Sequence, residues 1–135
     1  MSHRVLPRRT SLTGPYWDAC QRGELAIQRC TACRLYIHLP EPSCPGCSAA
    51  ELTFEPVSGR GAVHTFTVVH RTFAPGFEDR IPYVLAWIEL IEQPGLRAFG
   101  NVLDAPPDSV HIGQPVELCF EELPGFGQIP NFRAC

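Results

Sequence analysis

The residues best suited to chemistry are four cysteines that form two Cys-x-x-Cys pairs, Cys30/Cys33 and Cys44/Cys47, with ten residues between the pairs. Such thiols serve as redox centres, as disulfides or as metal ligands. Because the N-terminal residues lack the apolar stretch of a secretory signal, we expect a cytoplasmic protein, in which persistent disulfides are uncommon. No helical periodicity follows Cys33 or Cys47, which disfavours a thioredoxin-like redox site. The spacing therefore predicts a metal site.

Four thiolates supplied by two tight turns match the tetrahedral coordination of Zn²⁺. The same four sulfurs can hold iron, which is the main alternative metal. Four protein ligands leave no open coordination position, so the metal is expected to hold the fold rather than to activate a substrate. We thus predict a structural Zn²⁺ ion on Cys30, Cys33, Cys44 and Cys47.

The segments around these cysteines have the composition of a short helix followed by a small β-ribbon. Residues 13–23, TGPYWDACQRG, begin with Thr13 as a candidate cap and end at Gly23, which suits a helix exit. One face of this helix, which either packs within the protein or docks to a partner, comprises Tyr16, Trp17 and Cys20. The sequence predicts a helical segment over residues 1–24 and a zinc ribbon over residues 25–56.

From Gly61 onward the pattern is all-β. Apolar or alternating runs, each typical of a strand, occupy residues 62–71, 82–91, 96–103, 115–122 and, more briefly, 129–133. Short strands with Gly- and Pro-rich connections favour a small closed barrel, because closure removes exposed strand edges. The predicted fold is therefore mostly β, with a five-stranded OB-fold barrel over residues 57–135; an SH3-like barrel is the alternative.

The run at 115–122 alternates cleanly between two faces. Val116, Leu118 and Phe120 share the face expected to join the core. The other face, which carries Glu121, is expected to meet solvent.

All eleven basic residues are arginines, and they are unevenly distributed. Residues 1–60 carry seven arginines and five acidic residues, whereas residues 61–135 carry four arginines and nine acidic residues. The acidic second half opposes the phosphate attraction expected of a nucleic-acid groove. No apolar run approaches the roughly 18 residues of a membrane span. We therefore expect neither nucleic acid nor a membrane as a partner.

The sequence contains no recognised nucleophile, Walker or dinucleotide-binding motif. The histidines lack the spacing of a zinc protease, and the acidic residues are dispersed. Cys20, Cys119 and Cys135 have no nearby base in the sequence that would activate them. We therefore predict that the chain has no catalytic residues of its own.

Two loops of the predicted barrel carry aromatic residues. Residues 71–82 join the first two strands and include Phe73, and residues 122–131 place Phe126 between two glycines. Aromatic side chains on such loops either bind a ligand or tuck into the end of the barrel.

The order of these features resembles a known protein family. The short helix, the segments QRCTACRLYIHLPEPSCPGC and GRGAVHTFTVVHRTFAPGFEDRIPYVLAWIEL, and then IGQPVELCFEE and IPNFR follow one another over residues 13–133. Together they are similar to the acyl-CoA-associated OB-fold proteins that carry an N-terminal rubredoxin-like zinc ribbon.

The sequence departs from the family pattern at two places. Arg34 stands where glycine is common after the second cysteine, and a slight strain of the turn is expected because glycine tolerates positive φ. The tripeptide HLP at residues 38–40 replaces the more usual proline-proline-arginine, which removes a basic residue that could contact phosphate.

The resemblance implies a structural Zn²⁺ on the four cysteines, an OB-fold barrel and no independent catalysis. Such proteins act as partners of thiolase-like enzymes, including ketothiolases and sterol side-chain aldolases, or of acyl-CoA hydratases. The leading hypothesis is thus an accessory subunit that binds such an enzyme and helps to bind or channel acyl-CoA, with catalysis in the partner.

Four residues are candidates for contact with acyl-CoA or with the partner: Arg60, His70, Arg71 and Phe73. Arginine suits the phosphates of CoA, and an aromatic ring can cover its adenine or pantetheine. Two other functions remain open. An OB-fold with exposed aromatic residues can bind single-stranded nucleic acid, and an iron-loaded four-cysteine site would make a rubredoxin-like electron carrier.

Overall fold

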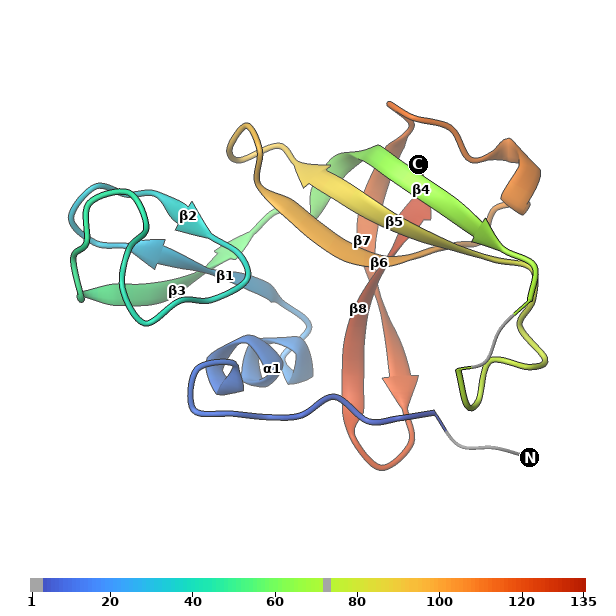
Figure 1. The fold of residues 1–135 in the computed structure, drawn as a ribbon, viewed down its shortest axis with the longest axis horizontal. Coiled ribbons are helices and arrows are strands. Elements are labelled where there is room, and N and C mark those ends of the chain that lie inside the picture. Colours follow the sequence, from blue (N-terminus) through green and yellow to red (C-terminus); the bar gives the residue numbers. More distant parts are fainter. Residues whose placement is uncertain (1–3, 72–73) are drawn as a thin grey trace.

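The computed structural model describes residues 4–71 and 74–135. A small three-stranded sheet lies beside a larger five-stranded barrel, and a short helix lies below the junction between them (Figure 1). The predicted fold class is confirmed: the chain is mostly β, with one short α-helix, a ribbon that bears the four cysteines and an OB-type barrel. Among the residues described, no helix is long and apolar enough to cross a membrane.

The helix α1 spans Gly14–Gln21, close to the predicted range. Thr13 occupies the cap position, but its Oγ1 does not bond to the helix. It accepts instead a hydrogen bond from the backbone N–H of Thr10, at 3.0 Å. Gly23 ends the helical segment with φ +79°, a conformation that glycine adopts without a Cβ penalty.

The small sheet contains β1 (Leu25–Cys30), β2 (Tyr36–Ile37) and β3 (Leu52–Val57), antiparallel in the order β2-β1-β3. The central strand β1 places Cys30 at its end, opposite Leu52 of β3. The first Cys-x-x-Cys turn thus follows directly from β1 and leads into β2.

The barrel consists of β4 (Arg60–Val69), β5 (Tyr83–Leu90), β6 (Arg97–Leu103), β7 (Pro115–Leu123) and β8 (Gly127–Ala134), with the 3-10 helix η1 (Pro107–Ser109) between β6 and β7. It closes in the order β4-β5-β6-β8-β7. All pairs are antiparallel except β6 with β8. Closure leaves every strand of the barrel paired on both sides, which is the physical reason that five short strands suffice.

A β-bulge in β4 changes which residues face the core. The pairing with β5 shifts between Val63 and Thr65, so that one additional residue is accommodated there. Val63 is buried, and beyond the bulge Phe66 and Val68 pack against the same core. Without the extra residue, the odd spacing between Val63 and Phe66 would place them on opposite faces.

The main core extends beyond the barrel into the small sheet. Leu25 and Ile27 of β1 belong to the same buried cluster as Val63, Ile88 and Phe132 of the barrel. A second, smaller cluster surrounds the cysteines and contains Cys30, Ile37 and Cys44. The inner half of the ribbon therefore shares the barrel's core, and only its outer half depends on its own.

Two expectations about the end of the chain were wrong. Residues 122–131 do not form a long loop, because β7 and β8 continue to Leu123 and from Gly127 as a tight hairpin. Phe126 at its tip packs against Trp17 of α1, with ring centroids 5.2 Å apart. Glu121 does not face solvent either: its side chain is only 15% exposed, because Arg4 and Arg80 cover it.

Candidate functional site

The four cysteines come together at the outer end of the ribbon. Their Sγ atoms all lie within 4.8 Å of one another, and the pairs Cys30/Cys47 and Cys33/Cys44 are 3.6 Å apart. Four sulfurs about 2.3 Å from one Zn²⁺ ion, in tetrahedral directions, lie about 3.8 Å from each other. The donor set and its spacing therefore fit a tetrahedral metal ion.

Each Cys-x-x-Cys turn has the same backbone plan. The N–H of Arg34 donates to the carbonyl of Cys30 at 3.0 Å, and the N–H of Ser48 donates to the carbonyl of Cys44 at 2.8 Å. Both Arg34 and Ser48 have positive φ, 68° and 66°. The turn thus requires a left-handed residue directly after its second cysteine, and Arg34 adopts the conformation that usually favours glycine.

Backbone N–H groups point at the sulfurs of the two buried cysteines. The N–H of Cys33 donates to Sγ of Cys30 at 3.4 Å, and that of Gly46 donates to Sγ of Cys44 at 3.3 Å. The first of these bonds lowers the pKa of Cys30 to about 6, and backbone donation from Cys47 likewise lowers the pKa of Cys44. The turns thus favour the thiolate forms of Cys30 and Cys44, which metal ligation needs, whereas burial and the neighbouring sulfurs raise the pKa of Cys33 to about 12.

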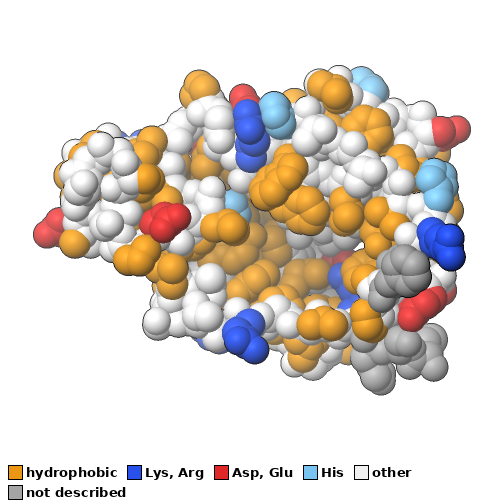
Figure 2. All heavy atoms as spheres, viewed as in Figure 1, with side chains coloured by type: hydrophobic (Ala, Val, Ile, Leu, Met, Phe, Trp, Pro, Cys, Tyr) orange, Lys and Arg blue, Asp and Glu red, His pale blue; other side chains and the backbone are white. Residues whose placement is uncertain are grey.

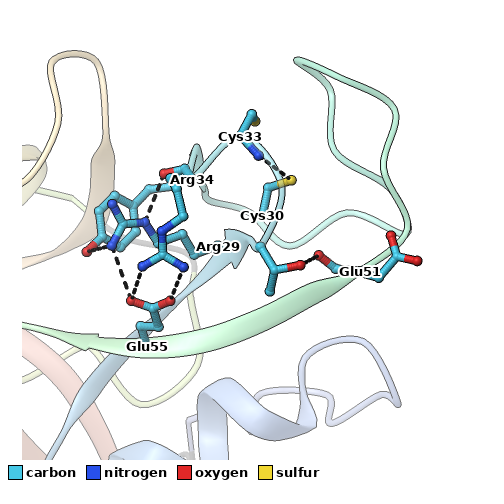
Figure 3. Close-up of polar contacts among 8 residues, drawn as sticks. Arg29, Cys30, Cys33, Arg34, Glu51 and Glu55 are labelled. Atoms are coloured by element: carbon cyan, nitrogen blue, oxygen red, sulfur yellow. Dashed lines mark hydrogen bonds and ion pairs between the residues drawn. The ribbon is translucent and has the colours of Figure 1, made fainter.

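An ion-pair cluster supports the first turn from the side (Figure 3). Arg29 and Arg34 converge on the carboxylate of Glu55, with N–O distances of 3.2 and 3.1 Å. Arg29 also donates to the carbonyl of Arg34 at 2.8 Å and stacks on the ring of Tyr36, 4.1 Å from its centroid. Contacts with Arg29 of β1 and Glu55 of β3 therefore hold Arg34, the residue with the strained backbone φ.

The residues predicted to contact acyl-CoA or a partner are not gathered in one place. Arg60 begins β4 and His70 follows its end, so about 30 Å separates them along a strand of this length. Arg71 adjoins His70, and Phe73 lies outside the described residues. His70 borders a hollow of about 230 Å³ with Val68, Pro82, Pro107 and Asp108. Whether these residues bind a ligand stays a prediction.

Three glutamines that the sequence analysis did not single out join the parts of the molecule. The side-chain amide of each bonds to both the N–H and the C=O of one residue: Gln21 to Gln128, Gln28 to Glu41 and Gln93 to Tyr36. The Gln93 amide links the β5–β6 turn to β2, and the Gln21 amide links α1 to β8. The donor–acceptor distances of these six hydrogen bonds lie between 2.7 and 3.1 Å. Glutamine carries no pattern that would predict such long-range pairing.

A second missed cluster ties the N-terminal segment to the barrel. Arg4, 14% exposed, lies 2.9 Å from Glu121 and 4.6 Å from the ring centroid of Phe77, and Arg80 pairs with the same carboxylate. Asn131 donates to Glu121 as well, at 2.9 Å. The N-terminal segment, the β4–β5 loop and the β7–β8 hairpin therefore meet at one partly buried carboxylate, that of Glu121.

Near α1, the side chains that could act as acids or bases have pKa values shifted away from neutral pH. Burial lowers the pKa of His38 to about 4, and its Nδ1 is buried without a hydrogen-bond partner. Burial raises the pKa of Tyr16, whose ring lies 5.4 Å from that of His38. Burial also raises the pKa of Cys20 to about 11, which leaves its thiol protonated and a poor nucleophile.

Two family models match successive parts of the chain. The family model described as the rubredoxin-like zinc ribbon domain of ChsH2 matches residues 17–53, and that described as the C-terminal OB-fold domain of ChsH2 matches residues 54–121. The predicted domain boundaries, at residues 24/25 and 56/57, remain predictions.

Relatives and a solved structure agree with these models. The probable enoyl-CoA hydratase alpha subunit of Thermomonospora curvata is 36% identical over 118 residues, which are 87% of this chain and 36% of the relative. A DUF35 domain-containing scaffold protein of Methanothermobacter thermautotrophicus is 35% identical, with 76% of each chain covered. A chain of the solved Ltp2-ChsH2(DUF35) aldolase matches with a TM-score of 0.87 and 34% identity, over 96% of this chain and 98% of that one.

The chain thus spans about a third of the hydratase alpha subunit but nearly all of the matched chain in the aldolase structure. The resemblance inferred from the sequence is confirmed. A four-cysteine ribbon and an OB-fold barrel, in this order and with these matches, place the protein in the ChsH2 (DUF35) family.

Proposed function

We propose that this chain is a non-catalytic partner subunit of an acyl-CoA-processing enzyme. The observation that carries the proposal is the match to a chain of the Ltp2-ChsH2(DUF35) aldolase over nearly the whole of both chains. The enzyme is a thiolase-superfamily member, such as an aldolase or ketothiolase, or an acyl-CoA hydratase, as the name of the Thermomonospora relative suggests. Catalysis then belongs to the partner, in keeping with the scaffold name of the archaeal relative.

The proposal is tested by purifying the tagged chain from its native host and identifying stoichiometric companions by mass spectrometry. We expect an aldolase, thiolase or hydratase at a fixed ratio, because a subunit of an obligate complex stays bound through gentle purification. A companion from none of these classes, or a chain that elutes alone, would contradict the proposal.

We further propose that the four cysteines bind one structural Zn²⁺ ion. The geometry of the sulfurs and the backbone N–H groups aimed at them support a tetrahedral thiolate site. Metal analysis should give one zinc per chain and a colourless protein. A red protein with one iron per chain would favour the electron-carrier alternative instead.

Acyl-CoA contact is proposed for the end of β4 that carries His70 and Arg71. The hollow beside His70 is lined mainly by apolar residues, which suits the pantetheine arm, and the next residue, Arg71, carries a guanidinium group of the kind that binds phosphates. Arg60 lies at the other end of β4, and partner contact is proposed for it instead.

The two ends of β4 can be compared by measuring acetyl-CoA affinity calorimetrically. Replacing Arg71 with alanine should weaken binding about tenfold, the loss of one charge-assisted contact of about 1.4 kcal/mol. Arg60→Ala serves as the matched control and should leave affinity unchanged. Equal affinities for both variants and the parent, with zinc content intact, would remove Arg71 from the site.

Nucleic acid is not favoured as the ligand. Among the described residues, at least eight of the eleven arginines pair with carboxylates: Arg4, Arg9, Arg22, Arg29, Arg34, Arg80, Arg97 and Arg133. Paired arginines attract phosphate weakly, because the neighbouring acid offsets their charge.

A further inference from the structure

The outer surface of β5 and β6 carries a stripe of exposed apolar side chains. Trp87 is 38% exposed, Phe99 49% and Ile91 65%, and Leu85 is half-buried on the same face. Along β5 the buried and more exposed positions alternate, so Leu85 and Trp87 point outward, and Glu89 follows them on the same face. Ile91 comes directly after β5, in the turn that leads to β6. These four residues, Leu85, Trp87, Ile91 and Phe99, are called the β5–β6 outer face below.

The two aromatic residues form a fixed pair. Trp87 and Phe99 are directly opposite in the β5–β6 register, and their rings meet edge to face with centroids 4.9 Å apart. Both rings are attached to paired strands of a closed barrel, β5 and β6. The pairing of the backbone therefore sets their orientation, which does not depend on a loop. Rigid aromatic side chains of this kind are typical of the residues that dominate binding energy in protein interfaces.

Hollows lie next to the stripe. One of about 220 Å³ is bordered by Trp87, Phe99 and Thr65, and another of about 370 Å³ lies further along β5 beside Ile91 and Pro94. Figure 2 shows hydrophobic side chains gathered over the middle of these strands and continuing into the hollowed surface between the barrel and α1. A hollow beside an aromatic pair can receive an apolar side chain from another molecule.

The charge on this face is neutralised within the chain. Glu89 and Arg97 occupy the next paired position in the register and lie 3.5 Å apart as an ion pair. Their mutual pairing leaves this part of the surface without a net charge to attract a polyanion or the phosphates of CoA. The face therefore suits a neutral, apolar surface.

The helix that could have covered the face lies elsewhere. α1 packs on β1, β8 and β3, and its aromatic residues Tyr16 and Trp17 meet His38 and Phe126. Within the described residues, the exposed fractions of Trp87, Phe99 and Ile91 show that the chain leaves this face uncovered.

We propose that the β5–β6 outer face is the apolar centre of the surface through which this chain docks to its enzyme partner. The inference rests on the proposed function. The fold closely matches a chain of an aldolase complex along nearly its full length, so docking is expected to use a surface that already exists on the folded chain. A rigid, neutral, apolar face is the feature of this surface that fits such a contact.

The size of the stripe distinguishes this occupant from a second copy of the chain. From Leu85 to Ile91 this face is about 20 Å long at 3.3 Å per residue and, across two strands, about 10 Å wide. The Glu89–Arg97 pair interrupts it, so its apolar part covers less than about 200 Å². A stable interface buries about 800 Å² on each side, and obligate homodimers bury more with a larger apolar share. The stripe fits the centre of a larger mixed contact, with the polar surface around it as the rim.

The test uses the complete chain and the enzyme subunit that co-purifies with it. Trp87→Thr and Phe99→Thr retain strand propensity while removing the aromatic rings. Ile112→Thr is the control, because Ile112 is an apolar side chain that is even more exposed than Trp87 and Phe99 but lies on the loop before β7. Thermal unfolding and zinc content confirm that each variant is folded before its affinity for the enzyme subunit is measured calorimetrically.

We expect each aromatic variant to weaken binding at least tenfold and the control to bind within twofold of the parent. A folded double variant that still binds within twofold would overturn the inference while leaving the proposed function intact. Failure to find any enzyme that co-purifies with the chain would contradict both the inference and the proposed function. Light scattering provides a further outcome: a parent homodimer that the double variant converts to monomer would assign the face to a second copy instead.

A second measurement does not depend on substitution of the face. The chain contains two tryptophans, Trp17 and Trp87, so labelling with 5-fluorotryptophan gives two ¹⁹F resonances. Adding unlabelled enzyme subunit should change the chemical shift of Trp87 and leave the chemical shift of Trp17, which packs between Tyr16 and Phe126, unchanged, while slower tumbling broadens both resonances. A Trp87 resonance that does not respond in the bound state would contradict docking at this face.

Discussion

The ribbon and the barrel reach stability by different routes, although both are built from short antiparallel strands. Around the cysteines, the buried cluster contains only Cys30, Ile37 and Cys44, with a few partly buried neighbours. The barrel encloses a continuous core that includes Ile88 and Phe132 and extends into the inner half of the ribbon. A cluster as small as the first cannot offset the conformational entropy of the loops around it, so we expect the outer ribbon to depend on the proposed metal.

The two clusters also indicate that the ribbon depends on the barrel for its packing, whereas the barrel does not depend on the ribbon's cysteines. Leu25 and Ile27 of β1 are part of the barrel's core, whereas the cysteines contribute nothing to it. Loss of the metal should therefore loosen only the outer ribbon, and loss of barrel packing should loosen both regions. The four predictions that follow test this asymmetry, from the largest expected effect to the smallest.

Removing the metal should have the largest local effect. In Cys44→Ser, or in the parent treated with a chelator, we expect amide protection to be lost over about residues 30–51 and kept in β5 and β8. Hydrogen exchange read by mass spectrometry measures both regions at once. Cys119→Ser, which changes a cysteine of the barrel, is the control and should leave the ribbon protected. Loss of protection throughout the barrel would show that the two regions unfold as one.

A cavity in the core of the barrel should destabilise both the barrel and the ribbon. Ile88 is fully buried, so Ile88→Ala should lower the free energy of unfolding by about 2–5 kcal/mol and reduce protection in β1 as well as in the barrel. Ile112→Ala, at an exposed position, should change it by less than about 0.5 kcal/mol. Urea unfolding gives the energies. A ribbon whose protection survives in destabilised Ile88→Ala would mean that β1 does not need the barrel's core.

The buried His38 predicts a pH dependence at the junction. Its pKa in the folded protein is about 4, below the usual 6.5, so the neutral form is favoured by folding. The contribution to stability is full above pH about 6.5 and is lost as pH falls toward 4, by at most about 3 kcal/mol. His38→Phe, which retains the ring contact with Tyr16, should show a shallower loss across this range. Because acid also releases metal from both proteins, only the difference between their urea midpoints is interpreted. Identical pH profiles would contradict the assignment to His38.

The glutamine clamps should give the smallest and most local effects. Gln93→Leu removes two hydrogen bonds to Tyr36 and should cost about 1–2 kcal/mol, with faster exchange at β2. Gln21→Leu removes the equivalent bonds to Gln128 and should affect the β7–β8 hairpin instead. The two variants control for each other, since each loses the same chemistry at a different joint. Exchange that rises equally at both joints in either variant would argue against local clamps.

Much of the architecture was readable from the sequence because it depends on neighbours in the chain. The metal ligands follow from the spacing within each Cys-x-x-Cys turn, where local backbone hydrogen bonds fix the sulfurs. The barrel strands follow from alternating or continuous apolar runs, and the observed strands lie within a few residues of those runs. The expected strain at Arg34 is present as a φ of 68°, because that turn requires the same left-handed conformation in both pairs.

What only the tertiary structure decided involves partners far apart in the chain. Glu121 is buried because the N-terminal segment and the β4–β5 loop bring Arg4 and Arg80 onto it, which no local pattern at β7 can indicate. Barrel register joins Trp87 to Phe99, and a bulge within β4 sets the inward face beyond Val63. The sequence alone determined the elements and the four cysteines of the candidate metal site, since both depend on short-range spacing. Strand register and barrel closure determined which side chains lie together on the surface, because both depend on which strands pair in the folded protein.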